Sequence, residues 1–344
     1  MNGATIIVRS CSLPAFLAFM LMFTLGQIAG IASAQELRLD PKLVKGPDAC
    51  GECHKESIAA WKKTHHATTF KNLPRSKDSK KIAKAMGLRR IKSSSDCLTC
   101  HFTSAIAKRG KVKPIAGITC ESCHGAGADW IKVHSDYGGK GKTAKNEDPG
   151  HKKARWTKSV AAGMTRPGTL YQVANNCYGC HTVPNEKLVN VGGHAAGSAF
   201  ELVSWTQGEV RHNVWYSKEN NPASANRKRM MYVVGKMLDL EHALRGGAKA
   251  TQAGKYVDSM AKRAAAAQSA LEAIAGKIKA AEIGQAIAAA KGVKVSPNVA
   301  AKLNAAAGKV AAAAKALASN NDGSAFGGVD SMIPGPDKYK GKAP

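Results

Sequence analysis

The sequence predicts a mostly α-helical protein, and three segments in its second half give the clearest evidence. A helix is expected from about residue 225 to 245, because the pattern ends at a Gly-Gly pair, a typical stop signal. Between residues 257 and 278, apolar residues recur at alternating steps of three and four, as in a heptad seam. Pro297 then opens a further helix with an apolar side over 299–317. We expect these last two helices to pair as an antiparallel, alanine-rich hairpin.

The first 34 residues are predicted to be a secretory signal peptide. Arg9 precedes an apolar run over residues 13–25, and the small residues 32–34 form a cleavage site. No later segment has the roughly eighteen apolar residues needed to span a bilayer. We therefore expect an exported chain, periplasmic or beyond, without a transmembrane segment after cleavage. Cys11 belongs to the discarded segment.

Four copies of the motif Cys-x-x-Cys-His use every cysteine that follows the signal peptide. The cysteines are Cys50, Cys53, Cys97, Cys100, Cys120, Cys123, Cys177 and Cys180, and the histidines that follow them are His54, His101, His124 and His181. Two thiols at this spacing can add to the two vinyl groups on one edge of a porphyrin, and the next residue is then placed to bind the iron. The sequence therefore predicts four covalently attached haem c groups, with these histidines as proximal ligands.

Disulfide bonds and zinc are the competing interpretations of the paired cysteines. Disulfide frameworks do not require a histidine after every second cysteine. Zinc sites normally combine two Cys-x-x-Cys pairs at one metal and lack that repeated histidine. Aromatic residues are only 6% of the composition, which is few for a conventional core in a chain of this length. The histidine repeated after each cysteine pair and the small number of aromatic residues both favour haem.

The formal charge of +27 creates a strong positive field around the protein. One interpretation of this charge is a solvated, lysine-rich surface. The next is attraction to an acidic partner or to an anionic membrane face. No zinc-finger or RNA-binding signature accompanies the charge, so we do not expect a nucleic-acid partner. The expected partners are redox proteins with acidic docking surfaces.

The motif order and spacing resemble those of the tetrahaem cytochrome c-554 family of periplasmic electron carriers. The matching stretches include CGECHKESIAAWKKTHHATTF at residues 50–70 and GITCESCHGAG at 117–127, and the resemblance covers roughly residues 48–245. It implies a multihaem cytochrome c domain with little sheet, in which haems stack in close pairs. In nitrifying members of the family, the carrier accepts electrons from a hydroxylamine-oxidising enzyme.

Seven histidines compete for the four distal iron positions. They are His65, His66, His134, His151, His194, His212 and His242. If residues 55–70 form one helix, His66 lies about 18 Å along the axis from His54, at about 1.5 Å per residue. A histidine on this helix must therefore bind a haem other than the first, which brings two haems close together.

Periodicity and resemblance disagree about His65 and His66. His65 shares a helix face with Ile58 and Trp61, which indicates a buried position. His66 fits the family pattern Trp-x-x-x-x-His-Ala through Trp61 and Ala67. We follow the motif and predict that His66 is a ligand and His65 a surface or supporting residue.

The resemblance assigns His134 to the first haem and His242 to the fourth. By itself, a histidine on an apolar helix face such as His242 is more often a satisfied core residue than a ligand. In the family the second haem can be five-coordinate, and here either His194 or His212 could close it. His151 lies in a polar loop and is expected to be a hydrogen-bonding residue.

The sequence therefore predicts an electron carrier rather than an enzyme. The alternative is an oxidoreductase that acts on nitric oxide or hydroxylamine at one five-coordinate haem, and the surplus of histidines argues against it. The expected domains are the signal peptide (1–34), the tetrahaem domain (35–247), the helical hairpin (248–319) and a disordered Gly-, Pro- and Lys-rich tail (320–344). The hairpin is either a packing appendage or an arm that forms homo-oligomers.

Overall fold

The computed structural model describes Met1 and residues 37–215 and 219–344. Apart from Met1, the predicted signal peptide lies outside the described residues. The described residues from 37 onward belong to one compact unit. Within the described ranges, no helix has the length and apolarity needed to cross a membrane.

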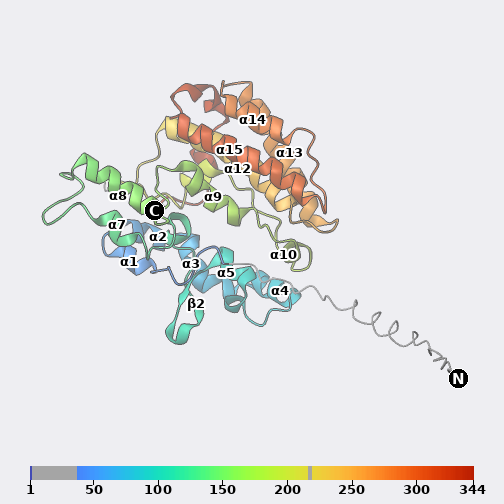
Figure 1. Ribbon diagram of the computed structural model, residues 1–344, viewed down its shortest axis with the longest axis horizontal. Helices are drawn as coiled ribbons and strands as arrows, with labels where there is room; N and C mark the ends of the chain where they lie inside the picture. Colours follow the sequence, from blue (N-terminus) through green and yellow to red (C-terminus); the bar gives the residue numbers. More distant parts are fainter. Residues whose placement is uncertain (2–36, 216–218) are drawn as a thin grey trace. The chain divides into compact units, whose positions relative to one another are not determined.

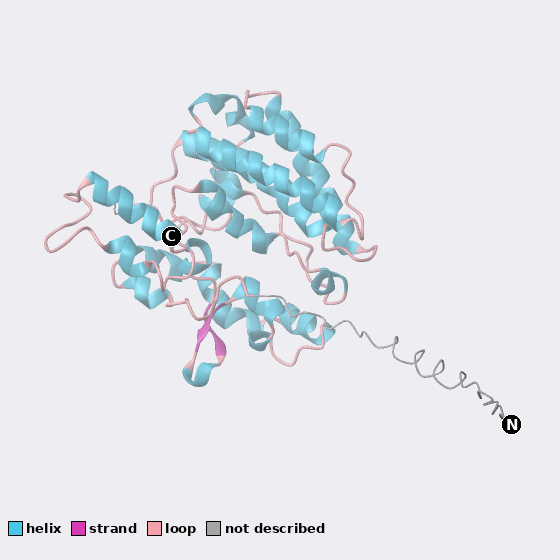
Figure 2. Ribbon diagram, in the orientation of Figure 1, coloured by secondary structure: helices cyan, strands magenta, loops and turns pink. Residues whose placement is uncertain are grey.

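The protein is mostly α-helical, as predicted (Figure 1). In the part of the chain that the structure describes, the sheet consists of two antiparallel strands, β1 (Thr103–Ile106) and β2 (Val112–Ala116). Figure 2 shows these strands as a hairpin among helices and loops. The predicted fold class, helical with little sheet, is therefore confirmed.

The first part of the chain consists of short helices. They are α1 (Pro47–Gly51), α2 (Lys55–Lys62), α3 (His65–Asn72), η1 (Leu73–Arg75), α4 (Lys77–Ala85), η2 (Ile91–Ser93), α5 (Ser95–His101), η3 (Lys108–Gly110), α6 (Cys120–His124) and α7 (Ile131–Ser135). The single helix expected over 55–70 is divided into α2 and α3. The Thr64 hydroxyl accepts a hydrogen bond from the Ala67 backbone N–H and so caps α3 at its start. The division places His65 and His66 in the first turn of a new helix.

The rest of the chain has longer helices. They are α8 (Pro149–Ala161), α9 (Leu170–His181), α10 (Glu186–Asn190), α11 (Leu202–Thr206), α12 (Ala225–Gly247), α13 (Lys255–Ala275), α14 (Ala281–Ala290) and α15 (Ala300–Asn320). Helix α12 packs against both α13 and α15, and α14 packs on α15. The expected hairpin of two paired helices is therefore not found: α13 and α15 each pack on α12, and the apolar segment Ala281–Ala290 forms a further helix between them in the sequence.

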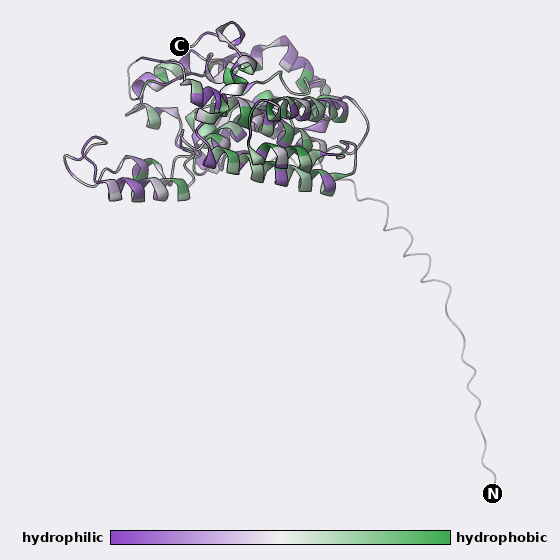
Figure 3. Ribbon diagram, turned by 90° about the horizontal axis from the view of Figure 1, so that it is seen from above, coloured by the Kyte–Doolittle hydropathy of each residue, from purple (hydrophilic) through white to green (hydrophobic). Residues whose placement is uncertain are grey.

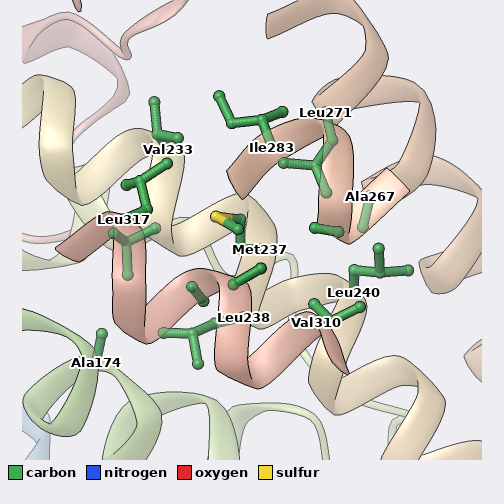
Figure 4. Packing of buried hydrophobic residues seen from close by; sticks show 14 of the residues in the cluster. Ala174, Val233, Met237, Leu238, Leu240, Ala267, Leu271, Ile283, Val310 and Leu317 are labelled. Atoms are coloured by element: carbon green, nitrogen blue, oxygen red, sulfur yellow. The ribbon is translucent and has the colours of Figure 1, made fainter. Parts of the chain in front are cut away.

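The apolar sides of α12 to α15 form one core (Figure 4). Met237 and Leu238 of α12, Leu271 of α13 and Val310 of α15 have no exposed surface. Both green and purple segments are visible along the helices in Figure 3, as amphipathic helices require. The alanine-rich helices therefore share the core of α12, although the sequence placed them in a separate domain.

The C-terminal residues are ordered, which differs from the expected disordered tail. A 3-10 helix, η4 (Ser324–Met332), buries Phe326 and Val329 in the core of α12 to α15. A second one, η5 (Pro336–Lys338), follows it. Two apolar residues three positions apart are enough to attach this segment, although its composition is that of a flexible tail.

Candidate haem-binding sites

Each Cys-x-x-Cys-His motif lies at or near the end of a short helical turn. The first begins in α1, the second ends α5, the third forms α6 and the fourth ends α9. Residues three apart in a helix lie on the same face, so both thiols of a motif point to the same side. None of the eight described cysteines forms a disulfide bond. This arrangement suits attachment to one porphyrin edge.

The motifs are grouped in pairs by contacts between their thiols. The side chain of Cys50 lies beside that of Cys120, so the first motif neighbours the third. The side chain of Cys100 lies beside that of Cys180, so the second motif neighbours the fourth. The four motifs therefore form two pairs of neighbouring sites.

Every motif histidine faces a histidine from outside the motifs, always with 6.3 Å between the ring centres. The pairs are His54 with His134, His101 with His194, His124 with His212, and His181 with His66. Two metal–nitrogen bonds of about 2 Å, added to the distance from each nitrogen to its ring centre, account for this separation. The spacing therefore fits an iron atom between the two rings of each pair.

Hydrogen bonds orient most of these rings. Nδ1 of His124, His134, His194 and His212 lies 2.9, 2.6, 2.8 and 2.7 Å from the backbone oxygen of Thr165, Ile131, Ala195 and Val210, respectively. Nδ1 of His181 lies 3.1 Å from the Ser198 hydroxyl. A ring that donates from Nδ1 keeps the lone pair of Nε2 free for a metal. These supporting groups leave no signal in the sequence.

Burial keeps the motif histidines neutral. It lowers the pKa of His101 to about 4 and that of His181 to about 4. It also lowers the pKa of His54 and His124 from their ordinary range. Neutral imidazole is the form that binds a metal, so these rings are ready to bind iron at neutral pH.

His66 points toward His181 of the fourth motif, whereas His65 points away. The backbone oxygen of His66 accepts a hydrogen bond of 2.9 Å from the Ile118 N–H. A Cβ atom on Gly117 would come within 2.1 Å of the same oxygen, so only glycine fits there. The His65 side chain is 88% exposed, and its Nδ1 lies 2.5 Å from Glu209. The helical phase indicated a buried position for His65, whereas the structure shows an exposed one.

His242 does not face a motif histidine in the structure. Its Nε2 lies 2.8 Å from Oδ1 of Asn175, and its ring packs against Tyr178 with 5.9 Å between the ring centres. Burial lowers the pKa of His242 to about 3. The structure therefore places His242 as a hydrogen-bonded core residue, which differs from the fourth-haem position that the resemblance assigned to it.

His151 belongs to a polar network beside the first site. Its Nδ1 lies 2.7 Å from Glu147, and Glu147 also binds Arg155. Arg155 donates a hydrogen bond of 2.5 Å to the backbone oxygen of His134. No sequence pattern indicates that Glu147 and Arg155 support a ligand candidate.

A space that is open to solvent adjoins the fourth motif. Cys177, Cys180 and His181 line it together with His66, and the rings of Phe200 and Trp205 complete part of the wall. Thiols, two opposed imidazoles and aromatic rings are the groups that a covalently bound haem requires. The residues present therefore fit the cofactor that the motifs predict.

Comparison with known proteins supports the same cofactor. The family "Cytochrome c554 and c-prime" matches residues 49–125. Cytochrome c-554 of Nitrosomonas europaea is 28% identical over 158 residues, which are 44% of this chain and 62% of that protein. The match thus spans less than two thirds of the relative, and no solved structure matches. Together with the motif order and the fold, these matches support a relationship between the haem-motif part of this chain and the cytochrome c-554 family.

Proposed function

We propose that this protein is an exported electron carrier with four haem c groups, one on each motif. The match to the cytochrome c-554 family supports covalently bound haem c and a role in electron transfer. The number four rests on one observation, the four histidine pairs with the same 6.3 Å separation. We further propose that it acts outside the cytoplasm with redox protein partners.

Each proposed haem has two histidine ligands. The pairs are His54 and His134 for the first haem, His101 and His194 for the second, His124 and His212 for the third, and His181 and His66 for the fourth. His242 is not a ligand in this proposal, because Asn175 occupies its Nε2. Two histidines on every iron leave no open position for a small molecule, so the proposal favours a carrier over an oxidoreductase.

The haems would supply the redox change, between ferric and ferrous iron. The motif cysteines would hold them through thioether bonds, and the histidine ligands would determine the spin state and influence the potential. Because Cys50 lies beside Cys120 and Cys100 beside Cys180, the first site would neighbour the third and the second site the fourth. Asn176 of α9 donates a hydrogen bond of 2.8 Å to the backbone oxygen of Cys123, so the third motif also lies beside the helix that carries the fourth. This arrangement would allow electrons to pass among all four sites.

The test combines mass and spectrum. The exported protein should carry the mass of four haems, and its ferric form should be entirely low-spin and unreactive toward cyanide and nitric oxide. His194→Ala and His66→Ala should each convert one haem to a high-spin form. His242→Ala is the matched control and should leave every haem low-spin. A high-spin signal in the wild type, or one produced by His242→Ala alone, would contradict these ligand assignments, and a colourless protein would refute the carrier.

A further inference from the structure

Helix α8 presents two large apolar side chains to the surface. Trp156 is 40% exposed and Val160 is 45% exposed. They are four residues apart, so they lie on the same face of the helix. Isolated exposed apolar residues are common, but an adjacent pair that includes tryptophan is typical of an interaction site.

Cations surround this apolar pair. The Nζ atom of Lys152 lies 5.3 Å from the centre of the Trp156 ring, and the guanidinium of Arg166 lies 4.0 Å from it. Lys153 and Lys158 are also exposed on α8. The sequence has no Asp or Glu between residues 149 and 185, so no carboxylate from this stretch offsets the charge. The surface therefore combines an aromatic anchor with a basic rim, as protein interfaces do.

The opposite side of α8 and the segment that follows the helix each contact a proposed haem ligand. Arg155, which is 7% exposed, donates its hydrogen bond to the backbone oxygen of His134. Shortly after the helix, the backbone oxygen of Thr165 lies 2.9 Å from Nδ1 of His124. Only the thickness of one helix, about 10 Å, therefore separates the exposed face from the ligand of the first haem.

We propose that the surface formed by Lys152, Lys153, Trp156, Val160 and Arg166, here called the α8 patch, docks an acidic redox protein that exchanges electrons with the first haem. This inference rests on the proposed electron-carrier function. Carboxylates of the partner would pair with the cations, and an apolar recess would receive Trp156. A lipid surface fits less well, because an interfacial helix needs a broad apolar face, whereas the inner side of α8 is already buried in the protein.

The experiment uses reduced flavodoxin, a small acidic redox protein, as the probe. One electron passes from the flavin hydroquinone to a ferric haem, which leaves the semiquinone and a ferrous haem. Stopped-flow absorbance of the holoprotein measures the rate at low and high salt. Lys152→Glu/Lys153→Glu should lower the low-salt rate about tenfold, and Trp156→Ala should lower it at both salt concentrations.

Lys111→Glu/Lys113→Glu is the matched control. Both lysines are exposed on the β1–β2 hairpin, and the variant makes the same change in net charge. Its rate should stay within about twofold of the wild type. If both double variants lost the same fraction of the rate, docking at the α8 patch would be overturned, because the net charge alone would then account for the attraction. Unchanged rates in the α8 variants would overturn it as well.

Vesicle binding and haem content distinguish protein docking from lipid binding and from loss of the cofactor. If the α8 variants keep their flavodoxin rate but no longer sediment with phosphatidylglycerol vesicles, the patch binds lipid and the proposal is wrong. Haem content and the ferric spectrum are recorded for every sample. A wild type without haem refutes the carrier function itself, whereas a fully loaded wild type whose rate does not depend on the patch refutes only the docking site.

Discussion

The haem-motif region and the four-helix region of this chain are stabilised in different ways. In α12 to α15, long helices bury fully enclosed side chains such as Met237 and Leu271 in one shared core. Between residues 37 and 135, helices are short, and the core cluster there contains only Ala83, Ile91, Leu98 and Phe102. Helices of five to nine residues are not stable alone. The comparison supports the proposal that haem serves as the core in one region, while side chains form it in the other.

Removal of the haems should have the largest effect. If all eight motif cysteines are replaced by alanine, residues 37–135 should exchange their amide hydrogens almost as fast as an unfolded chain. Helices α12 to α15 should keep most of their protection, because Tyr178 is the one buried motif residue in their core and side chains of the helices themselves form the rest of it. Hydrogen exchange read by mass spectrometry compares the two regions in one sample, with the loaded wild type as the control. Equal protection in both regions would remove the distinction between them.

The local parts of the proposed site were predictable from the sequence. The Cys-x-x-Cys-His motif lies within five consecutive residues, so its chemistry can be recognised without the fold. His66 and His134 followed from the family resemblance. The α2–α3 division was missed, because the Thr64 cap makes a weaker pattern than the surrounding helix signal.

Long-range contacts were the part that the sequence could not supply. The position of His242 on its helix is the same whether its side chain binds iron or packs in the core. The structure shows that it contacts Asn175, which lies on a different helix. The sequence left His194 and His212 as alternatives for one haem, whereas the structure places them opposite His101 and His124. Both lie in loops without periodicity, so only the fold determines which ring each one faces.

A cavity in the four-helix region should have the next largest effect. Leu271→Ala removes a side chain with no exposed surface and should lower the free energy of unfolding by about 2–5 kcal/mol. The haem absorption spectrum of the folded protein should not change, because Leu271 belongs to the core of α12 to α15. Chemical denaturation followed by circular dichroism measures the loss. The exposed Lys262→Ala on the same helix should change stability by about 0.5 kcal/mol or less, and a similar loss in both variants would contradict the side-chain core.

The smallest effect is expected from Glu147→Gln, which tests a polar support of the haem-motif region. Hydrogen bonds from Arg155 lower the pKa of Glu147 from its ordinary 4.5 to about 2. A carboxylate with a lowered pKa stabilises the folded state above pH 4.5, and this contribution disappears as the pH falls to about 2. The variant should therefore be less stable than the wild type at pH 7, and the difference should shrink between pH 4.5 and 2.

The loss caused by Glu147→Gln should be smaller than that of Leu271→Ala, because the amide oxygen of glutamine still accepts a hydrogen bond from Arg155. Urea denaturation at a series of pH values measures it, with the exposed Glu52→Gln as the control. Protonation of the histidine ligands affects wild type and variant alike, so it cancels in their difference. A difference that stays constant down to pH 2 would show that the ion pair between Glu147 and Arg155 does not support this region.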